Sequence, residues 1–177
     1  MKPLNTRLLN QFLNLACERL SGEWLLIGGT LLPAVGIYFR PTIDIELVGL
    51  GEKEAAQTLE LMDLAQSLDL PIESINQAAS FFVKKIGVDK KDLITLKKGK
   101  RAVIYRPSVI LYWKLKLPRL TESDVLDCEH YLAYCKGQAD KFNQASLKKE
   151  VERQLEAGGT PERIARLKRL QNLLDRD

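Results

Sequence analysis

The sequence has 177 residues, of which 45% are apolar and 28% are charged, and its formal net charge is +4. This balance is typical of a globular protein and excludes intrinsic disorder, because disordered chains lack so much apolar sequence. No apolar run reaches the roughly 18–20 residues that a membrane-spanning helix needs, and the mild positive charge permits a polyanionic partner without requiring one.

The first half of the chain predicts helices that alternate with two short strands. Residues from about 4 to 20 carry apolar side chains at helical spacing, which predicts an amphipathic helix rather than a signal peptide. An apolar run over residues 24–27, bounded by glycines, predicts a buried strand, and a helix starts within residues 30–35. Residues 43–48 alternate apolar and acidic side chains, as in a half-buried strand. Two helices are expected next, at 52–68 and 71–86.

The second half predicts one hairpin followed by helices. Residues 92–96 and 101–105 form the expected hairpin, and the helices are expected at 107–117, 122–136, 144–156 and after Thr160-Pro161. This order indicates an α+β fold with a small mixed sheet flanked by helices and a helical C-terminal part. We expect residues 1–106 to form the α/β core and residues 107–177 to pack on it as one compact domain.

Two short motifs suggest chemistry. A strand that runs into Gly28-Gly29 and then a helix leaves backbone N–H groups unobstructed, which favours binding of an anion. Asp44 and Glu46 lie two residues apart on a strand, so their carboxylates point the same way and a cation such as Mg²⁺ or Mn²⁺ would offset their repulsion. Each motif alone is more often an ordinary turn or a solvated sheet face. Together they predict metal-assisted phosphoryl or nucleotidyl transfer.

These residues carry a resemblance to a known family. The first block reads Gly28-Gly29-Thr30-x-Leu32, then Gly36, then Arg40-x-Thr42-x-Asp44-Ile45-Glu46-Leu47. It resembles the signature of the DNA polymerase β-like nucleotidyltransferase superfamily, and most closely the AbiEii-type toxin nucleotidyltransferases and their uncharacterised bacterial relatives. A second block is similar to the family pattern as well and comprises Arg106-Pro107-Ser108, Lys114-Leu115, Arg119 and residues 123–127. The resemblance covers residues from about 24 to 135.

The resemblance implies a nucleotidyltransferase-type sheet and an enzyme that depends on Mg²⁺ or Mn²⁺ and moves an NMP from an NTP to an acceptor hydroxyl. The roles that it implies are triphosphate binding for Gly28, Gly29 and Thr30, metal binding for Asp44 and Glu46, charge neutralisation for Arg40 and Lys114, and assistance to the acceptor or the metal for Asp124. It also suggests an RNA acceptor such as the tRNA 3′ end, and a toxin–antitoxin context with a cognate antitoxin.

The helix at 107–117 offers two lysines with different expected surroundings. Lys114 falls within the expected apolar stripe of this helix, where an ammonium group must reach solvent or meet an anion. Lys116 lies almost opposite and is expected to be solvated. Lys114 is therefore the better candidate for the triphosphate, the alternative being an ion pair with Asp124 or Asp127. Asp124 near the start of the next helix also suits a simple interaction with the helix dipole.

Several alternatives stay open. Glu46 stands where many relatives have aspartate, and the third carboxylate of polymerase-like members has no clear counterpart, which favours a catalytically weak or inactive module that binds NTP or RNA. Another alternative is an enzyme whose acceptor is a small molecule, such as an aminoglycoside antibiotic, or a protein hydroxyl. The basic residues of the last two helices indicate either a solvated face or an RNA contact. The three cysteines are an odd number without metal-like spacing, which favours a reduced, cytoplasmic setting. We expect no membrane partner, because no apolar run is long enough to span a bilayer.

Overall fold

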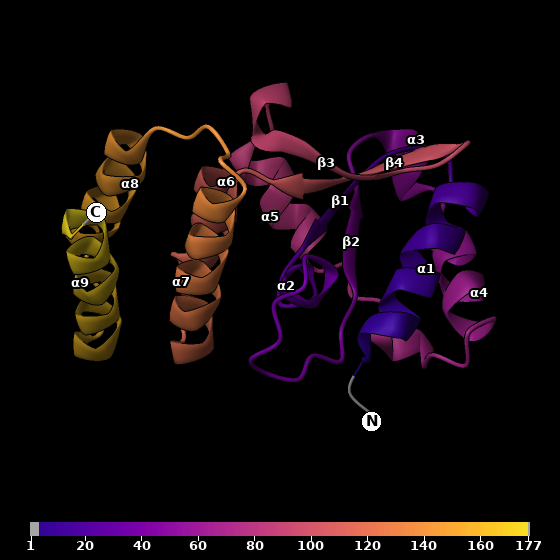
Figure 1. Ribbon diagram of the computed structural model, residues 1–177, viewed down its shortest axis with the longest axis horizontal. Helices are drawn as coiled ribbons and strands as arrows, with labels where there is room; N and C mark the ends of the chain where they lie inside the picture. The colour runs from indigo at the N-terminus through magenta and orange to yellow at the C-terminus, as the bar shows by residue number, and fades with distance from the viewer. Residues whose placement is uncertain (1–3, 177) are drawn as a thin grey trace. The chain divides into compact units, whose positions relative to one another are not determined.

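The computed structural model describes residues 4–176, with Ala55 described only in its backbone. The chain divides into two compact units, the first ending at Pro107 and the second beginning at Ser108. The expected boundary lay one residue earlier. The first unit holds the sheet with its helices, and the second is helical (Figure 1). Close packing of the two units into one domain stays a prediction.

The sheet of the first unit is mixed, as the sequence predicts. Its strands are β1 (Gly22–Ile27), β2 (Glu46–Gly49), β3 (Leu93–Lys98) and β4 (Ala102–Pro107), in the spatial order β2-β1-β4-β3. β1 pairs antiparallel with β2 and parallel with β4, while β3 and β4 form the predicted hairpin. The α+β class with a small mixed sheet is therefore confirmed.

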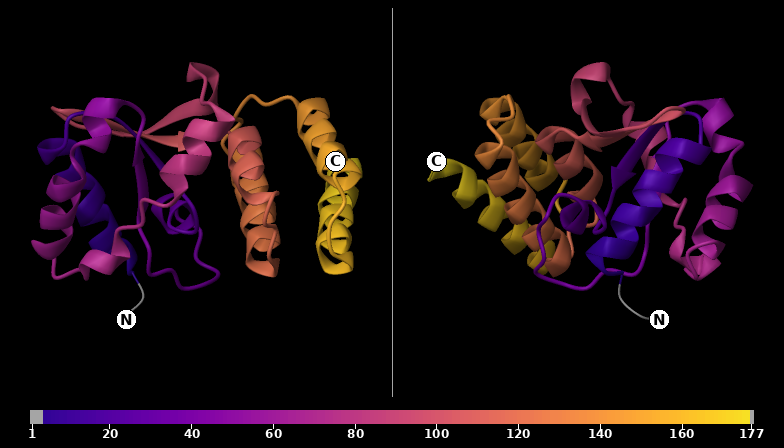
Figure 2. Two further views of the ribbon diagram at one scale, coloured as in Figure 1. Left: turned by 180° about the vertical axis from the view of Figure 1, so that it is seen from behind. Right: turned by 45° about the vertical axis from the view of Figure 1, so that its right-hand side comes forward.

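Helices cover both faces of this sheet. They are α1 (Thr6–Arg19), α2 (Leu31–Ala34), α3 (Glu52–Ala55), α4 (Thr58–Gln66) and α5 (Ala79–Ile86), with short 3-10 turns η1 (Ile72–Ser74) and η2 (Lys90–Asp92). α1 packs on β3 and β4 and beside α4, whereas α5 contacts β2. Figures 1 and 2 show α1 and α5 on opposite sides of the sheet. The core between them includes the fully buried side chains of Trp24, Leu26 and Ile104.

The predicted strand at 43–48 is shorter than expected and begins only at Glu46. Because Glu46 pairs with Ile27, the last residue of β1, the residues before Glu46 lie beyond the end of β1 and have no neighbouring strand on that side. Ile45 instead forms an isolated parallel bridge with Ile75. Ile43, which the alternation at 43–48 places on the apolar face of the expected strand, is 41% exposed, so the half-buried strand does not extend to it.

Two predicted helices are interrupted. The helix expected at 52–68 divides into α3 and α4. At the break the Gln57 side chain bonds the Ser21 backbone, accepting from its N–H at 2.8 Å and donating to its carbonyl at 3.0 Å. The helix expected at 71–86 divides into η1 and α5 because Ile75 is extended and pairs with Ile45.

The described part of the second unit contains α6 (Val109–Lys116), α7 (Glu122–Gly137), α8 (Gln144–Glu156) and α9 (Pro161–Asp175). A polar side chain caps the start of each of these helices, and the caps are Ser108, Thr121, Asn143 and Thr160. α6 packs on α7 and α8, and α9 packs on the same two helices. Figure 1 shows α8 and α9 next to each other. Among the described residues, no helix combines the length and the apolar character that crossing a membrane requires.

We expect Leu26→Ala to lower the free energy of unfolding by about 3 kcal/mol, because it leaves a cavity in the sheet core. Leu26 is fully buried, whereas Leu59 on α4 is 75% exposed and provides a matched control. Leu59→Ala should change the free energy of unfolding by less than about 0.5 kcal/mol. Urea unfolding measures both values, and equal losses would contradict this assignment of the core.

Candidate functional site

A glycine turn ends the buried strand β1. The chain leaves the sheet after Ile27, and Gly28 adopts φ +70°, a backbone conformation that residues with a Cβ atom rarely adopt. Gly29 and Thr30 follow and lead into α2. The sequence alone predicts a turn here, and the structure adds that two side chains from later in the chain lie against it.

The Glu46 side chain occupies the space beside Gly28. A Cβ atom placed on Gly28 would collide with Oε2 of Glu46. The reason lies in the register of the sheet, which sets Glu46 directly opposite Ile27. Glu46 is half-buried, so its carboxylate lies at the turn without being sealed inside the core.

The Arg40 side chain lies against the next glycine. A Cβ atom on Gly29 would lie 2.6 Å from Nη2 of Arg40, closer than real contacts allow. The Arg40 guanidinium also lies over the Phe39 ring, 5.9 Å from its centroid. A cation and a carboxylate therefore lie at two consecutive glycines, and a Cβ atom at either position would displace the end of that side chain.

Asp44 is attached to the same turn through its backbone. The Thr30 hydroxyl donates to the Asp44 carbonyl, and Thr30 is fully buried. The next residue, Ile45, bonds in the opposite direction, accepting from Asn76 N and donating to Ser74 O. This alternation is that of an extended chain, so the side chains of Asp44 and Glu46 leave the same face. The hydrogen bond places the Asp44 backbone beside the turn, and a shared site for the two carboxylates stays a prediction.

The first unit thus brings together the predicted residues Gly28, Gly29, Thr30, Arg40, Asp44 and Glu46. We call this group the turn cluster. Its hard carboxylate oxygens suit Mg²⁺ or Mn²⁺, and Arg40 suits a phosphate. Within residues 4–176 no three His, Cys, Asp or Glu side chains gather in a way that could hold a metal ion. A cation at the turn cluster would therefore take its other ligands from water and substrate phosphates, as Mg²⁺ commonly does.

The remaining two predicted residues, Lys114 and Asp124, belong to the second unit. Asp124 is 1% exposed and forms a capping box with Thr121 at the start of α7. Its Oδ1 accepts from Lys116 Nζ and Arg119 Nη2, both at 2.9 Å, and its Oδ2 accepts from Arg119 Nε and from the Thr121 N–H and hydroxyl. Lys116 also donates to Asp127 Oδ2 at 2.8 Å. These contacts occupy the Asp124 carboxylate completely, so it has no lone pair left for a metal ion.

The charges in this buried group support one another. Burial alone would raise the pKa of Asp124, but the hydrogen bonds from Arg119 and the charge of Lys116 outweigh it and hold that pKa well below its usual range. Burial likewise would lower the pKa of Lys116, yet the charges of Asp127 and Asp124 outweigh it and raise that pKa. Asp124 and Lys116 are therefore both ionised at neutral pH, and their ion pair ties α6 to α7.

The prediction that Lys116 is solvated is wrong, since it is 8% exposed. The buried face of α6 contains Val109, Tyr112 and Lys116, which follow one another at spacings of three and four. Lys114 is half-buried and lines a pocket against α8 instead. Most faces of α6 carry apolar side chains, so hydrophobic periodicity does not determine which face is buried most deeply. The spacing of Val109, Tyr112 and Lys116 is the one signal in the sequence that places Lys116 on a buried face.

Comparisons with known proteins neither support nor contradict the resemblance to the nucleotidyltransferase superfamily. No family model matches the chain, and no curated protein or solved structure is significantly similar to it.

We expect Lys116→Met to lower the free energy of unfolding by about 3–5 kcal/mol, because Asp124 and Asp127 then lack a buried cation. Lys114→Met removes the same charge from the same helix outside this group and should have an effect below about 1 kcal/mol. Urea unfolding of the two variants distinguishes them, and a larger effect at Lys114 would refute the assignment.

The lowered pKa of Asp124 also predicts an acid dependence. Its pKa in the unfolded chain is about 3.9, so the folded-state ion pairs stabilise the protein fully above that pH and are lost progressively as the pH falls below it. The unfolding free energy of the wild type should therefore fall more steeply below pH 4 than that of Asp124→Asn. Urea unfolding at pH 7, 4 and 3 measures this, and parallel curves would contradict it.

Proposed function

We propose that this protein is a metal-dependent nucleotidyltransferase, which moves an NMP from an NTP to an acceptor hydroxyl. The observation that supports this most is the turn cluster. The Glu46 carboxylate lies at Gly28, the Arg40 guanidinium lies at Gly29, and the Asp44 carbonyl accepts from the Thr30 hydroxyl. The extended chain through Ile45 directs the Asp44 carboxylate to the same side as that of Glu46. A phosphate-binding cation beside two carboxylates is the set of groups that such a transfer needs.

In this proposal Asp44 and Glu46 hold Mg²⁺ or Mn²⁺ through their carboxylate oxygens. The bound metal would supply Lewis-acid polarisation of the α-phosphate and neutralise charge on the leaving pyrophosphate. Arg40 neutralises a further phosphate charge through its planar donor pair. The acceptor oxygen forms a new bond to the α-phosphorus while the bond to the β-phosphate breaks, and pyrophosphate leaves with its electron pair as the acceptor hydroxyl loses its proton to water.

The roles of three other predicted residues follow from their contacts. Gly28 and Gly29 provide close access to the backbone at the turn. Thr30 uses its hydroxyl proton on the Asp44 carbonyl, so we assign it the positioning of Asp44 rather than direct contact with a phosphate. Asp124 is not part of the proposed chemistry, because its oxygens are already occupied. For Lys114, contact with the triphosphate stays a prediction.

The acceptor is proposed from the resemblance alone. RNA, in particular the tRNA 3′ end, is the leading candidate, with the protein acting in the cytoplasm as a toxin controlled by a cognate antitoxin. A small-molecule or protein hydroxyl is the alternative. One observation favours a non-catalytic NTP- or RNA-binding module instead, namely that the part of the chain described here gathers no third acid at the turn cluster.

The test is transfer of label from each α-labelled NTP, with Mg²⁺ or Mn²⁺, to total tRNA, an aminoglycoside or the protein itself. We expect label transfer by the wild type and a decrease of at least about a hundredfold in Asp44→Asn and Glu46→Gln, because each loses a metal ligand. Asp63→Asn, an exposed acid on α4, is the matched control and should leave the rate unchanged.

The outcomes separate the candidate functions. The labelled acceptor identifies the substrate class. NTP binding without transfer to any acceptor would support the binding module and refute the enzyme. Equal rates in Asp44→Asn and the control would show that the chemistry takes place elsewhere.

A further inference from the structure

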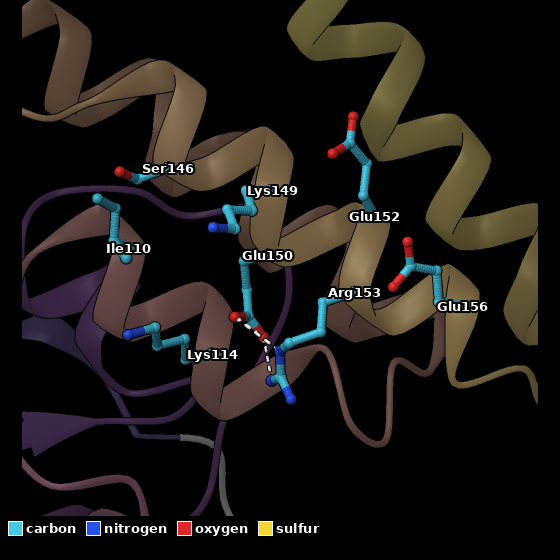
Figure 3. Close-up of a pocket in the computed structure, with 8 residues that line it drawn as sticks. All are labelled: Ile110, Lys114, Ser146, Lys149, Glu150, Glu152, Arg153 and Glu156. Carbon is cyan, nitrogen blue, oxygen red and sulfur yellow. Dashed lines mark hydrogen bonds and ion pairs between the residues drawn. The ribbon is translucent and has the colours of Figure 1, made fainter.

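Several basic side chains of the helical unit are paired with acids. Figure 3 shows Arg153 bonded to Glu150 on α8, at 2.5 Å. Arg169 on α9 bonds Glu129 on α7 at 2.7 Å. The pocket drawn in Figure 3 is lined by as many acids as bases, so it carries no net charge. These residues therefore offer no unmatched positive charge to a polyanion, in contrast to α5 in the first unit.

The solvent face of α5 carries two large aromatic side chains. Phe81 is 67% exposed and Phe82 is 55% exposed, whereas Val83 is the one buried side chain described for this helix. The two rings meet edge to face, with their centroids 5.6 Å apart and their planes at 82°. Each ring therefore restricts the orientation of the other, while more than half of each stays open to solvent.

Two lysines lie beside these rings. Lys84 and Lys85 follow them on α5, and both are exposed. Residues three and four apart are neighbours on a helix surface, so both lysines adjoin Phe81, and Lys85 also adjoins Phe82. Neither ammonium group forms a hydrogen bond or an ion pair with any residue that the structure describes. We call Phe81, Phe82, Lys84 and Lys85 the α5 surface.

The acids around the α5 surface do not cancel its charge. Residues 74–88 contain no Asp or Glu, and the first acid after them, Asp89, pairs with Lys91 at 3.2 Å. A hollow of about 340 Å³ beside α5 has three charged residues in its lining, which are Lys84, Lys90 and Glu23. Two cations against one acid leave this hollow positive as well.

Exposed rings beside unmatched cations suit a single-stranded nucleic acid. Bases of any sequence stack on aromatic rings, and phosphates are attracted to lysines. A duplex suits the surface less, because its base faces are already covered by stacking. A second copy of the chain would bring further lysines against Lys84 and Lys85, and these like charges repel one another.

From this arrangement we infer that the α5 surface binds single-stranded nucleic acid, with bases stacked on Phe81 and Phe82 and phosphates held by Lys84 and Lys85. Neither a ring face nor an ammonium group distinguishes ribose from deoxyribose here, so RNA and DNA strands should bind alike. The inference stands on α5 alone and does not depend on the proposed transfer.

The test of the rings is the fluorescence anisotropy of labelled single-stranded RNA and DNA titrated with the full chain. We expect Phe81→Leu to raise the dissociation constant about tenfold, because it keeps an apolar side chain but removes the stacking face. Phe81→Tyr keeps the ring and should bind as the wild type does. Leu59→Ala, which removes an exposed apolar side chain from α4, is the matched control and should have no effect.

The test of the lysines is the salt dependence of the same binding. Each phosphate neutralised on a single strand contributes about 0.7 to the slope of log K against log salt, so Lys85→Gln should reduce that slope by about 0.7. Lys168→Gln makes the same charge change at an exposed position on α9 and should leave the slope unchanged. Phe81→Leu should lower the affinity without changing the slope.

Other outcomes would overturn the inference. Equal affinities of Phe81→Leu and Phe81→Tyr would show that the rings do not stack on bases, and equal affinity for a duplex would show the same. Binding to phosphatidylserine vesicles, or self-association in sedimentation, that Phe81→Leu abolishes while nucleic-acid affinity is unchanged would assign the surface to a membrane or to a second copy. Asp44→Asn should bind the strands unchanged, so loss of label transfer and loss of this surface are distinguishable.

Discussion

The pairing of β1 with β2 is the constraint on which the rest of the turn cluster depends. The antiparallel ladder sets Ile27 opposite Glu46, so β2 begins where β1 ends and the Glu46 carboxylate reaches the first glycine of the turn. Because side chains alternate along a strand, a shift of one residue would move both acids to the other face. The bond from Thr30 to the Asp44 carbonyl holds the chain ahead of β2 in that same register.

The two units place their acids in different physical settings. Asp44 and Glu46 are half-buried at the end of a sheet, where a carboxylate can exchange water for a ligand. Asp124 and Asp127 are buried on α7 and share Lys116, with Arg119 closing over one of them. A buried charge is stable only when it is fully paired and hydrogen-bonded. The ion pairs of Lys116 with Asp124 and Asp127 therefore hold α6 and α7 together. Acidic side chains are thus open to solvent in the first unit and are held in buried ion pairs in the second.

The sequence by itself determined most local structure and the membership of the turn cluster. Polar caps and hydrophobic periodicity place the helices of the second unit, and α8 has the predicted bounds of 144–156. The alternation around Asp44 and Glu46 and the glycines after β1 are local signals as well, since they depend on neighbours within a few residues. For the same reason the short spacing of Gly28-Gly29 and Asp44-x-Glu46 could be interpreted before the fold was known.

Tertiary structure alone decided which partners these residues meet. At the break in the helix expected at 52–68, Gln57 bonds Ser21, a residue 36 positions away that no local pattern could identify as its partner. Which face of α6 is buried depended on the helices packed around it, and so did the partnership of Lys116 with Asp124 and Asp127. Periodicity reports one apolar face and says nothing of what covers it, so the surroundings of an ionisable group, and hence its role, are fixed only when distant segments meet.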